Sequence, residues 1–273
     1  MPATNSDTDL DTNPFDTFAR LYDWEHDQFD QDVTLYLALV RRFGGPVLEL
    51  ACGTGRVLAT LASAGFGCTG VDSSPAMLER AAQRLRDHAL SAQLVQQRVE
   101  ELHLDRTFRT ILWPLDGLGL LLTRAAQLAA LRAARACISH DGRLVLDLAN
   151  GNLRGGELPE ELQRHLTAPD PSTGRLITKW SARRSDPAEQ LDELTFLYDE
   201  TDEDRVVHRT TVQLSLRWFT RWELELLLER AGWEQAELYG GYALESYGPS
   251  SERLLVVARP ARQSTEGRAD RSI

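Results

Sequence analysis

The clearest hydrophobic pattern in this 273-residue chain lies between Val47 and Asp72. An apolar run of strand length, Val-Leu-Glu-Leu, is followed by Ala-Cys-Gly-Thr-Gly-Arg, and a second apolar run ends at Asp72. Glycine lets the backbone turn sharply and approach a ligand with no Cβ in the way. The pattern therefore predicts a buried strand, a glycine turn, a helix over residues 57–65 and a second strand. Together these form the first half of a nucleotide-binding α/β unit.

Two positions indicate which nucleotide this unit binds. Asp72 ends the second strand, where a carboxylate about twenty residues after the loop can accept both hydroxyls of a ribose. A dinucleotide site also needs a third glycine, so that the helix starts close to the pyrophosphate. Leu58 occupies that position. So large a side chain favours S-adenosylmethionine, a cofactor without phosphates, over NAD.

Two stretches of the chain resemble the class I S-adenosylmethionine-dependent methyltransferases. They are Val-Leu-Glu-Leu-Ala-Cys-Gly-Thr-Gly-Arg and Gly-Val-Asp-Ser-Ser-Pro-Ala-Met-Leu. The family's first motif is an acidic residue followed by x-Gly-x-Gly-x-Gly, and Ala51 replaces its first glycine here. The resemblance implies that Glu49 orients the amino group of the cofactor and that Asp72 holds its ribose. Gly53 and Gly55 would lie under its methionine part.

The adenine end of the site departs from the family pattern. The third strand is expected over residues 92–97, and the aspartate and apolar residue that bracket adenine in the family fall on Arg98 and Val99. Arginine cannot accept a hydrogen bond from the adenine amino group. Val99 is retained for its backbone amide and apolar contact, and Glu100 takes the role if the register differs. The cofactor-binding residues that the resemblance implies are Tyr22, Glu49, Ala51, Gly53, Gly55, Asp72, Ser73, Met77, Val99 and Pro114.

Two helices are predicted before the first strand. Phe15, Phe18 and Leu21 recur at helical spacing in one segment, and a second helix fits residues 32–43, where Gly-Gly-Pro stops it. Both helices are expected to lie across the mouth of the cofactor site. Tyr22 resembles the tyrosine that small-molecule methyltransferases carry in such a lid, and a core aromatic is the alternative.

The other core elements follow from the same helical and strand periods. Strands are predicted over 110–113, 143–148, 233–239 and 253–259, and helices over about 123–140 and 220–231. Thr220 and Glu223 match a capping box, and Trp222 is assigned to the buried face of the helix that follows. The last strand is expected to be antiparallel, an ending that dehydrogenases lack.

A strict period of two appears between residues 151 and 216. The alternating runs cover 175–184, 191–198 and 206–216. They predict an inserted antiparallel sheet, in which the acidic stretch 199–204 is interpreted as a solvated hairpin tip. Similar insertions after the fifth strand cover the acceptor pocket in small-molecule methyltransferases, so this one is expected to form a lid.

The predicted fold is a Rossmann-like α/β domain with a seven-stranded sheet, an antiparallel last strand, a helical N-terminal lid and an inserted antiparallel β lid. Its parts are a disordered N-terminus (1–13), the helical lid (14–45), the cofactor-binding core (46–150), the inserted lid (151–216), the C-terminal part of the core (217–260) and a disordered tail (261–273).

Charge and composition narrow the function classes. The formal net charge is −11, and Lys179 is the only lysine among the 30 basic residues. Nucleic acid needs a local positive field that this acidic chain does not gather in patches, so it is not an expected partner. Cys52, Cys68 and Cys137 have neither metal nor redox spacing, which predicts no metal and a reducing cytoplasm. No apolar run reaches membrane-spanning length, so no membrane anchor is expected.

The predicted function is transfer of a methyl group from S-adenosylmethionine to a small-molecule acceptor by in-line displacement. The sulfonium already activates the methyl group, so the protein mainly holds the nucleophile in line and excludes water. Candidates for handling the proton of the acceptor are Tyr22, His26, Asp116, His208 and Tyr242, each with a structural or solvated role as its alternative. The alternative functions are a non-catalytic cofactor-binding protein and an NAD-dependent oxidoreductase. Whether oxygen, nitrogen or carbon is methylated stays open.

Overall fold

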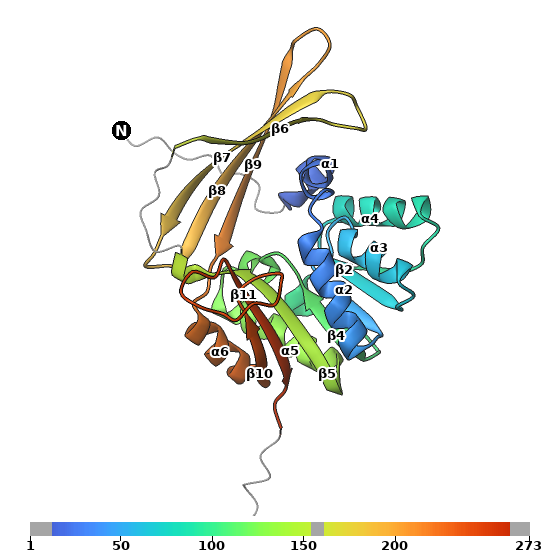
Figure 1. Cartoon of the computed structure of the whole chain (residues 1–273), viewed down its shortest axis with the longest axis vertical. Coiled ribbons are helices and arrows are strands. Elements are labelled where there is room, and N and C mark those ends of the chain that lie inside the picture. The colour runs from blue at the N-terminus through green and yellow to red at the C-terminus, as the bar shows by residue number, and fades with distance from the viewer. Residues whose placement is uncertain (1–12, 154–160, 263–273) are drawn as a thin grey trace, which may run out of the picture.

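Seven strands form the main sheet of the computed structural model, which describes residues 13–153 and 161–262 (Figure 1). Their order across the sheet is β10-β11-β5-β4-β1-β2-β3. The strands are β1 (Val47–Leu50), β2 (Cys68–Asp72), β3 (Gln93–Gln96), β4 (Phe108–Trp113), β5 (Ile138–Ala149), β10 (Trp233–Tyr239) and β11 (Arg253–Pro260). β1 pairs in parallel with β2 and β4, whereas β11 lies antiparallel between β5 and β10. The predicted seven-stranded sheet with an antiparallel last strand is confirmed.

Helices cover both faces of this sheet and build an apolar core on each. The helices of the described residues are α1 (Phe15–His26), α2 (Gln31–Phe43), α3 (Arg56–Ser63), α4 (Pro75–Asp87), α5 (Arg124–Cys137) and α6 (Arg221–Arg230), with short 3-10 turns η1 (Val99–Glu101), η2 (Gly117–Leu120) and η3 (Gly151–Leu153). On one face α2 and α3 bury Tyr36 and Leu58 against the sheet, and on the other α5 and α6 bury Leu131 and Leu228. Because each helix has one apolar stripe, the result is three layers.

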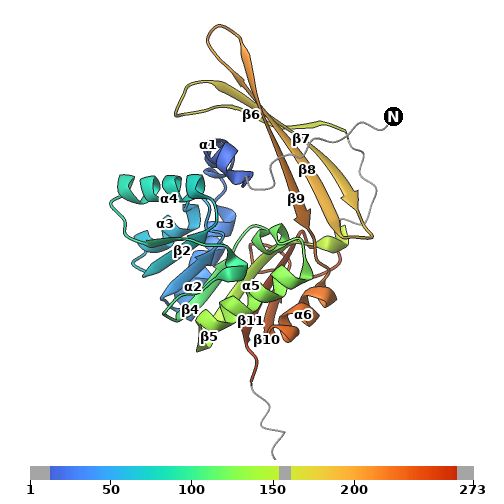
Figure 2. The same cartoon turned by 180° about the vertical axis from the view of Figure 1, so that it is seen from behind.

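A second sheet of four antiparallel strands follows β5, in the order β6-β7-β8-β9. These strands, here called the β lid, are β6 (Gln163–Pro169), β7 (Leu176–Asp186), β8 (Leu191–Thr201) and β9 (Val207–Arg217). Figures 1 and 2 show the β lid extending away from the main sheet, with α1 between it and α4. Phe18 and Leu21 of α1 pack against Ile177, Tyr198 and Val212 of the β lid. A small third core therefore joins the N-terminal helix to the inserted sheet.

The predicted end of α5 near His140 is wrong. The helix ends at Cys137, and Ile138 already pairs with Phe108 as the first residue of β5. Residues 139–142 lie in an irregularity of this strand, where a Cβ on Gly142 would lie 2.7 Å from Cγ1 of Ile138. The glycine thus permits a close approach inside the strand and does not mark the end of the helix.

Two predictions about α6 are also wrong. Trp222 is 65% exposed, because it is two positions from buried Leu224 and so lies on the opposite side of the helix. Thr220 occupies the N-cap position but its side chain makes no capping hydrogen bond. Glu223 instead accepts hydrogen bonds from Gln190 (2.6 Å) and Arg217 (2.9 Å). Its carboxylate ties α6 to the β lid.

The β lid differs from its prediction at two places. β6 was not predicted, since most of this edge strand is exposed and shows no apolar face. The acidic stretch 199–204 is not simply a solvated tip, because β8 continues to Thr201 and Glu200 is only 6% exposed. Glu200 accepts a hydrogen bond from Arg20 of α1 (2.6 Å).

Some predictions fall outside the described residues. Disorder was predicted over residues 1–13 and 261–273, of which 1–12 and 263–273 lie outside them, whereas Ala261 is described and its N–H donates to Gly232 O (3.0 Å). Asn13, at the predicted boundary, is described, and its side chain donates to Ser73 Oγ (3.0 Å). Within residues 13–153 and 161–262, no helix has the length and apolar character that crossing a membrane requires.

Candidate functional site

The glycine loop after β1 meets the end of β2 at the carboxyl edge of the main sheet. The backbone N–H groups of Gly53 and Ser74 donate to the two oxygens of Asp72, at 2.8 and 2.9 Å. Both Gly53 and Ala51 have φ of +52°, a region that residues with a Cβ rarely adopt. Burial raises the pKa of Asp72, and these two hydrogen bonds oppose the rise. The Asp72 carboxylate therefore fixes the conformation of the loop.

Gly55 allows α3 and α4 to approach closely. Its φ is +75°, and a Cβ there would lie 3.0 Å from Cβ of Ala81. We expect Gly55→Ala to lower the free energy of unfolding by about 1–3 kcal/mol in urea denaturation, because backbone strain adds to overpacking. Gly67→Ala is the matched control, since a Cβ at Gly67 has no neighbour within 4 Å. Equal destabilisation of the two variants would contradict this packing role.

A cavity of about 840 Å³ opens above the glycine loop and is bounded by the main sheet, α1 and the β lid. Its lining brings together most of the predicted site residues. These are Tyr22, His26, Glu49, Ala51, Gly53, Asp72, Ser73, Met77, Val99, Pro114 and Asp116. Gly55 is not part of the lining, because it packs against Ala81. We call this space the transfer cavity.

Glu49 is the most unusual polar group in the lining. It stands near the end of β1, is 2% exposed, and its Oε2 has no hydrogen-bond partner among the described residues. Burial raises the pKa of Glu49 to about 8, although nearby Arg56 acts in the opposite direction. Arg56 itself is engaged by Asp32 through two hydrogen bonds of 2.8 and 2.6 Å. A buried acceptor without a partner is costly, so the site favours a ligand that brings a donor, above all a cationic one.

A strained turn after β4 forms another wall. Leu115 and Asp116 have φ of +44° and +61°, which costs on the order of 1–3 kcal/mol at each residue. Asp116 Oδ1 accepts a hydrogen bond from Ala149 N (2.5 Å), and its Oδ2 lies 3.4 Å from Nη1 of Arg253. These contacts hold the turn against β5 and β11. They also occupy the carboxylate that was predicted as a candidate for proton transfer.

Two further candidates do not reach the transfer cavity. His208 lies near the outer end of the β lid, where its side chain is 55% exposed and its Nε2 is 3.1 Å from Asp202 Oδ2. Tyr242 donates to Asp147 Oδ2 (3.1 Å) and does not line this space. His208 is therefore removed from the candidates, and Tyr242 supports a neighbouring part of the structure.

Residues 47–142, which include the glycine loop, Asp72 and the strained turn, match the family described as a methyltransferase domain. The match shows a methyltransferase domain over these residues, and it supports the predicted resemblance to the class I S-adenosylmethionine-dependent methyltransferases. The predicted methyltransferase activity is thereby supported. The match favours methyl transfer over the alternative of an oxidoreductase.

Similar proteins match this chain over nearly its whole length. The putative methyltransferase YqeM of Bacillus subtilis (strain 168) is 24% identical over 256 residues, which are 90% of this chain and 96% of YqeM. An S-adenosylmethionine-dependent methyltransferase from Clostridium acetobutylicum has the same fold with a TM-score of 0.77 and 17% identity, covering 92% of this chain and 100% of that one. The sugar N-methyltransferase KedS8 from Streptoalloteichus superposes with a TM-score of 0.74 and 20% identity, covering 96% and 100%.

The part of the cavity that was predicted to hold adenine contains a carboxylate. Arg98 stands where the family carries an aspartate, and its side chain is 64% exposed and points its guanidinium at Glu100 (Nε to Oε1, 2.9 Å). Glu100 is only 14% exposed and lines the transfer cavity beside Val99. The 3-10 turn η1 therefore presents Glu100, the residue that the sequence left as the alternative, at this end of the transfer cavity.

The side of the transfer cavity that α1 and the β lid form, here called the roof, contains a polar group that the sequence did not predict. Lys179 of β7 is 7% exposed, forms a short ion pair with Glu25 of α1, and lies 4.2 Å from the centre of the Phe196 ring. Tyr198 donates to the other oxygen of Glu25 (2.8 Å). Burial acts to raise the pKa of Glu25, but Lys179 and His26 outweigh it and hold this pKa below its usual value. The one available signal was that the single lysine of the chain stands on an alternating strand.

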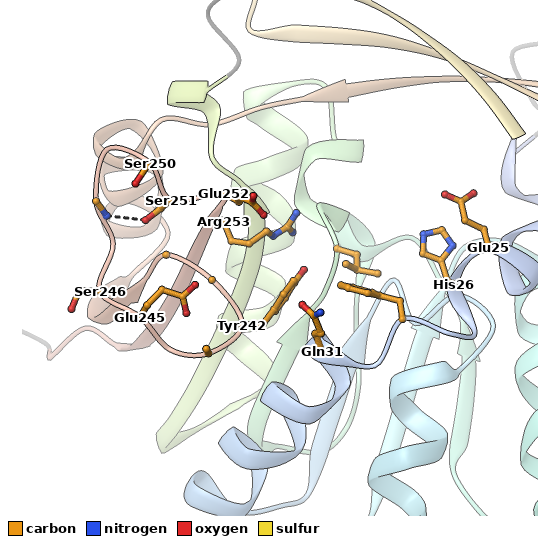
Figure 3. A pocket seen from close by; sticks show the side chains of 16 residues that line it. Glu25, His26, Gln31, Tyr242, Glu245, Ser246, Ser250, Ser251, Glu252 and Arg253 are labelled. Carbon is orange, nitrogen blue, oxygen red and sulfur yellow. Dashed lines mark hydrogen bonds between the residues drawn. The ribbon is translucent and has the colours of Figure 1, made fainter. Parts of the chain in front are cut away.

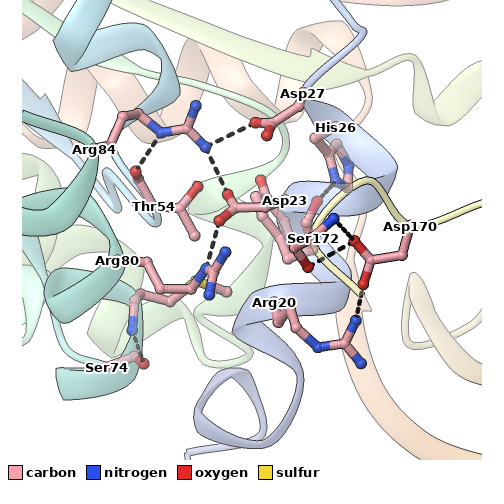
Figure 4. A network of polar contacts seen from close by, with 12 residues as sticks. Arg20, Asp23, His26, Asp27, Thr54, Ser74, Arg80, Arg84, Asp170 and Ser172 are labelled. Atoms are coloured by element: carbon pink, nitrogen blue, oxygen red, sulfur yellow. Dashed lines mark hydrogen bonds and ion pairs between the residues drawn. The ribbon is translucent and has the colours of Figure 1, made fainter. Parts of the chain in front are cut away.

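Charged pairs hold α1 in place above the cavity (Figure 4). On the core side, Asp23 of α1 accepts a hydrogen bond from Arg84 of α4 (2.8 Å) and pairs with Arg80. On the β-lid side, Arg20 pairs with Asp170 and with Glu200. These pairs are buried or half-buried, so salt screens them less than it screens exposed pairs. They therefore hold α1 in position above the transfer cavity.

His26 is the titratable group at the edge of the roof. Its ring stacks on Tyr22 with centroids 4.1 Å apart, and its Nδ1 lies 3.0 Å from the backbone carbonyl of Tyr22. A carbonyl only accepts, so Nδ1 carries the proton and Nε2 keeps a free lone pair in the neutral ring. Burial lowers the pKa of His26, whereas it raises the pKa of Tyr22 and keeps that phenol protonated.

Proposed function

We propose that the transfer cavity holds S-adenosylmethionine along the glycine loop and delivers its methyl group to a small-molecule acceptor under the roof. The observation that carries this proposal is the buried, partnerless oxygen of Glu49 in the same cavity as the Asp72 carboxylate. The amino group of the cofactor suits Glu49, and its ribose hydroxyls suit Asp72. The carboxylate of Glu100 can accept a hydrogen bond from the adenine amino group, and Met77 and Val99 offer apolar contact.

The mechanism we propose is an in-line displacement. When bound, S-adenosylmethionine supplies a methyl group on a positively charged sulfur, which is already activated for transfer. The protein therefore has to position the acceptor atom and exclude water. The strained turn at Leu115 and Asp116 bounds this space on one side, and the half-buried side chains of Phe196 and Leu214 bound it on the β-lid side.

The acceptor we propose is an amine. The likeness in fold between this chain and the sugar N-methyltransferase KedS8 supports this choice. An amine must be neutral when it attacks, and His26 offers an unprotonated Nε2 that can take its proton. The net charge of −11 disfavours a nucleic-acid acceptor.

Cofactor binding should release a proton. In the free protein, burial keeps Glu49 protonated up to about pH 8, and pairing with the cationic amino group requires its ionised form. Calorimetric titration with S-adenosylhomocysteine in two buffers of different ionisation enthalpy should show about one proton released at pH 6–7 and almost none at pH 9. Affinity should rise up to about tenfold per pH unit towards pH 8 and then level off. Glu49→Gln should abolish both effects, and a wild type that releases no proton at pH 6 would refute this role.

The same shift makes a prediction about stability without ligand. Because the pKa of Glu49 is raised on folding from 4.5 to about 8, the folded state binds more protons than the unfolded state between these pH values. The free energy of unfolding of the ligand-free protein should therefore fall as pH rises through this window. The contribution of this group is at most about 1.4 kcal/mol per pH unit. Urea denaturation should show a smaller decrease for Glu49→Gln, and identical pH profiles would contradict the shift.

A further inference from the structure

A second space, which we call the outer chamber, adjoins the transfer cavity. It has a volume of about 940 Å³ and lies between the connection from α1 to α2 and the loop that joins β10 to β11 (Figure 3). Glu25, His26 and Leu115 line both spaces. Figure 3 shows Glu25 and His26 on one side of the chamber and the loop residues Glu245 and Ser246 on the other. The two spaces therefore meet at these three side chains.

The two volumes indicate an acceptor larger than the group that is methylated. Cavities that enclose a drug-sized molecule measure roughly 300–1,000 Å³. The transfer cavity, at about 840 Å³, is therefore large enough for the cofactor and the reacting end of the acceptor. The outer chamber is a second volume of the same class. It has no part in the cofactor site proposed above.

The charges around the outer chamber favour a cation. Its lining includes the carboxylates of Glu245 and Glu252, which are exposed, and that of Glu25, which is already paired with Lys179. Apart from His26, the one basic side chain among the described residues of this lining is Arg253, which is held by Asp147 and Asp116. Within the part of the chain that the structure describes, Glu245 and Glu252 have no ion pair. A carboxylate or phosphate ligand would be repelled here, whereas an ammonium group would be attracted.

The remaining wall chemistry suits hydroxyl groups on a carbon skeleton. Phe29 and Tyr242 meet edge to face, with ring centroids 5.6 Å apart, and give the chamber an apolar surface. Gln31 and the hydroxyls of Ser246 and Ser250 add hydrogen-bonding groups around it. Such a surface can contact C–H groups while the polar side chains bind hydroxyls.

We propose that the outer chamber binds the body of the methyl acceptor, and that this body is hydroxylated and carries a positive charge separate from the reacting nitrogen. The inference rests on the proposed function, since it places the reacting nitrogen near His26, where the two spaces meet. Glu245 and Glu252 select the positive charge, and Phe29 and Tyr242 support the carbon skeleton.

Three probes test this selection in the protein saturated with S-adenosylhomocysteine. D-Glucamine, D-glucitol and D-gluconate have similar hydroxylated chains and differ chiefly in charge at one end. Saturation-transfer NMR titrations should rank their affinities in that order. The double variant Glu245→Gln/Glu252→Gln should weaken glucamine binding by about threefold to tenfold and leave glucitol unchanged. Raising the salt concentration should also reduce the preference for glucamine over glucitol.

The double variant Glu79→Gln/Glu203→Gln is the matched control, because it removes the same charge from exposed positions outside the chamber. The inference is overturned if gluconate binds as well as glucamine, if no probe binds, or if the chamber variant behaves like the control. Calorimetry with S-adenosylhomocysteine on the same samples separates the two proposals. Failure to bind it would refute the proposed function, whereas normal binding with unselective probes would refute the chamber alone.

Discussion

Replacing Asp72 by alanine is expected to weaken the binding of S-adenosylhomocysteine by about 1.5–3 kcal/mol, or roughly 10- to 150-fold. The variant loses a charge-assisted hydrogen-bond acceptor for the ribose, and a buried carboxylate has few substitutes nearby. It also loses the contact with Gly53 N (2.8 Å) that fixes the glycine loop. Both losses act on the same ligand, so isothermal titration calorimetry should show the full decrease.

Asp105→Ala is the control for this prediction, because the side chain of Asp105 is 98% exposed and lies outside the transfer cavity. The affinity of Asp105→Ala for S-adenosylhomocysteine should stay within about twofold of that of the wild type. Asp72→Asn separates the two causes, since its amide oxygen can still accept from the loop without the negative charge. An unchanged affinity in Asp72→Ala would remove this carboxylate from the cofactor site.

Replacing Leu214 by tryptophan is expected to reduce kcat/KM for methyl transfer by about 100-fold or more while leaving the affinity for S-adenosylhomocysteine within about twofold. Leu214 projects from β9 into the roof of the transfer cavity, next to Phe196. The larger ring fills the space assigned to the acceptor, and a displacement of about 1 Å in a reacting group can cost this much rate. The proposed division of the cavity therefore predicts a loss of transfer without a loss of cofactor.

Leu176→Trp is the matched control, because Leu176 is on the same lid, is 46% exposed and does not line the cavity. Its rate should be close to that of the wild type. Thermal unfolding of both variants checks that the lid still folds. A normal rate in Leu214→Trp, or an equal loss of cofactor affinity and rate, would contradict an acceptor site beneath the β lid.

The cofactor half of the fold could be predicted from the sequence because its signals are local. The strands Val47–Leu50 and Cys68–Asp72 have the predicted bounds. The loop and the end of β2 lie side by side in any parallel sheet of this kind, so the pattern also placed Gly53 and Asp72 together.

The roof could not be predicted, because its contacts join distant segments. Lys179 and Glu25 are 154 positions apart and meet only after the β lid has folded onto α1. The orientation of η1, which places Glu100 in the lining of the transfer cavity with the guanidinium of Arg98 against it, depends on tertiary packing and not on periodicity. The outer chamber depends on a loop between β10 and β11 that shows no regular pattern. Tertiary contacts therefore decided the features that bear on the acceptor.

The central claim is methyl transfer to a small-molecule amine, and isotope labelling tests it most directly. The protein is incubated with S-adenosyl-[methyl-13C]methionine and a cell extract, and the small-molecule, protein and nucleic-acid fractions are compared by mass spectrometry. The account predicts enzyme-dependent label on the nitrogen of an amine in the small-molecule fraction, and loss of that label in Leu214→Trp. Label confined to protein or nucleic acid, or carried on oxygen or carbon of the small-molecule product, would contradict it.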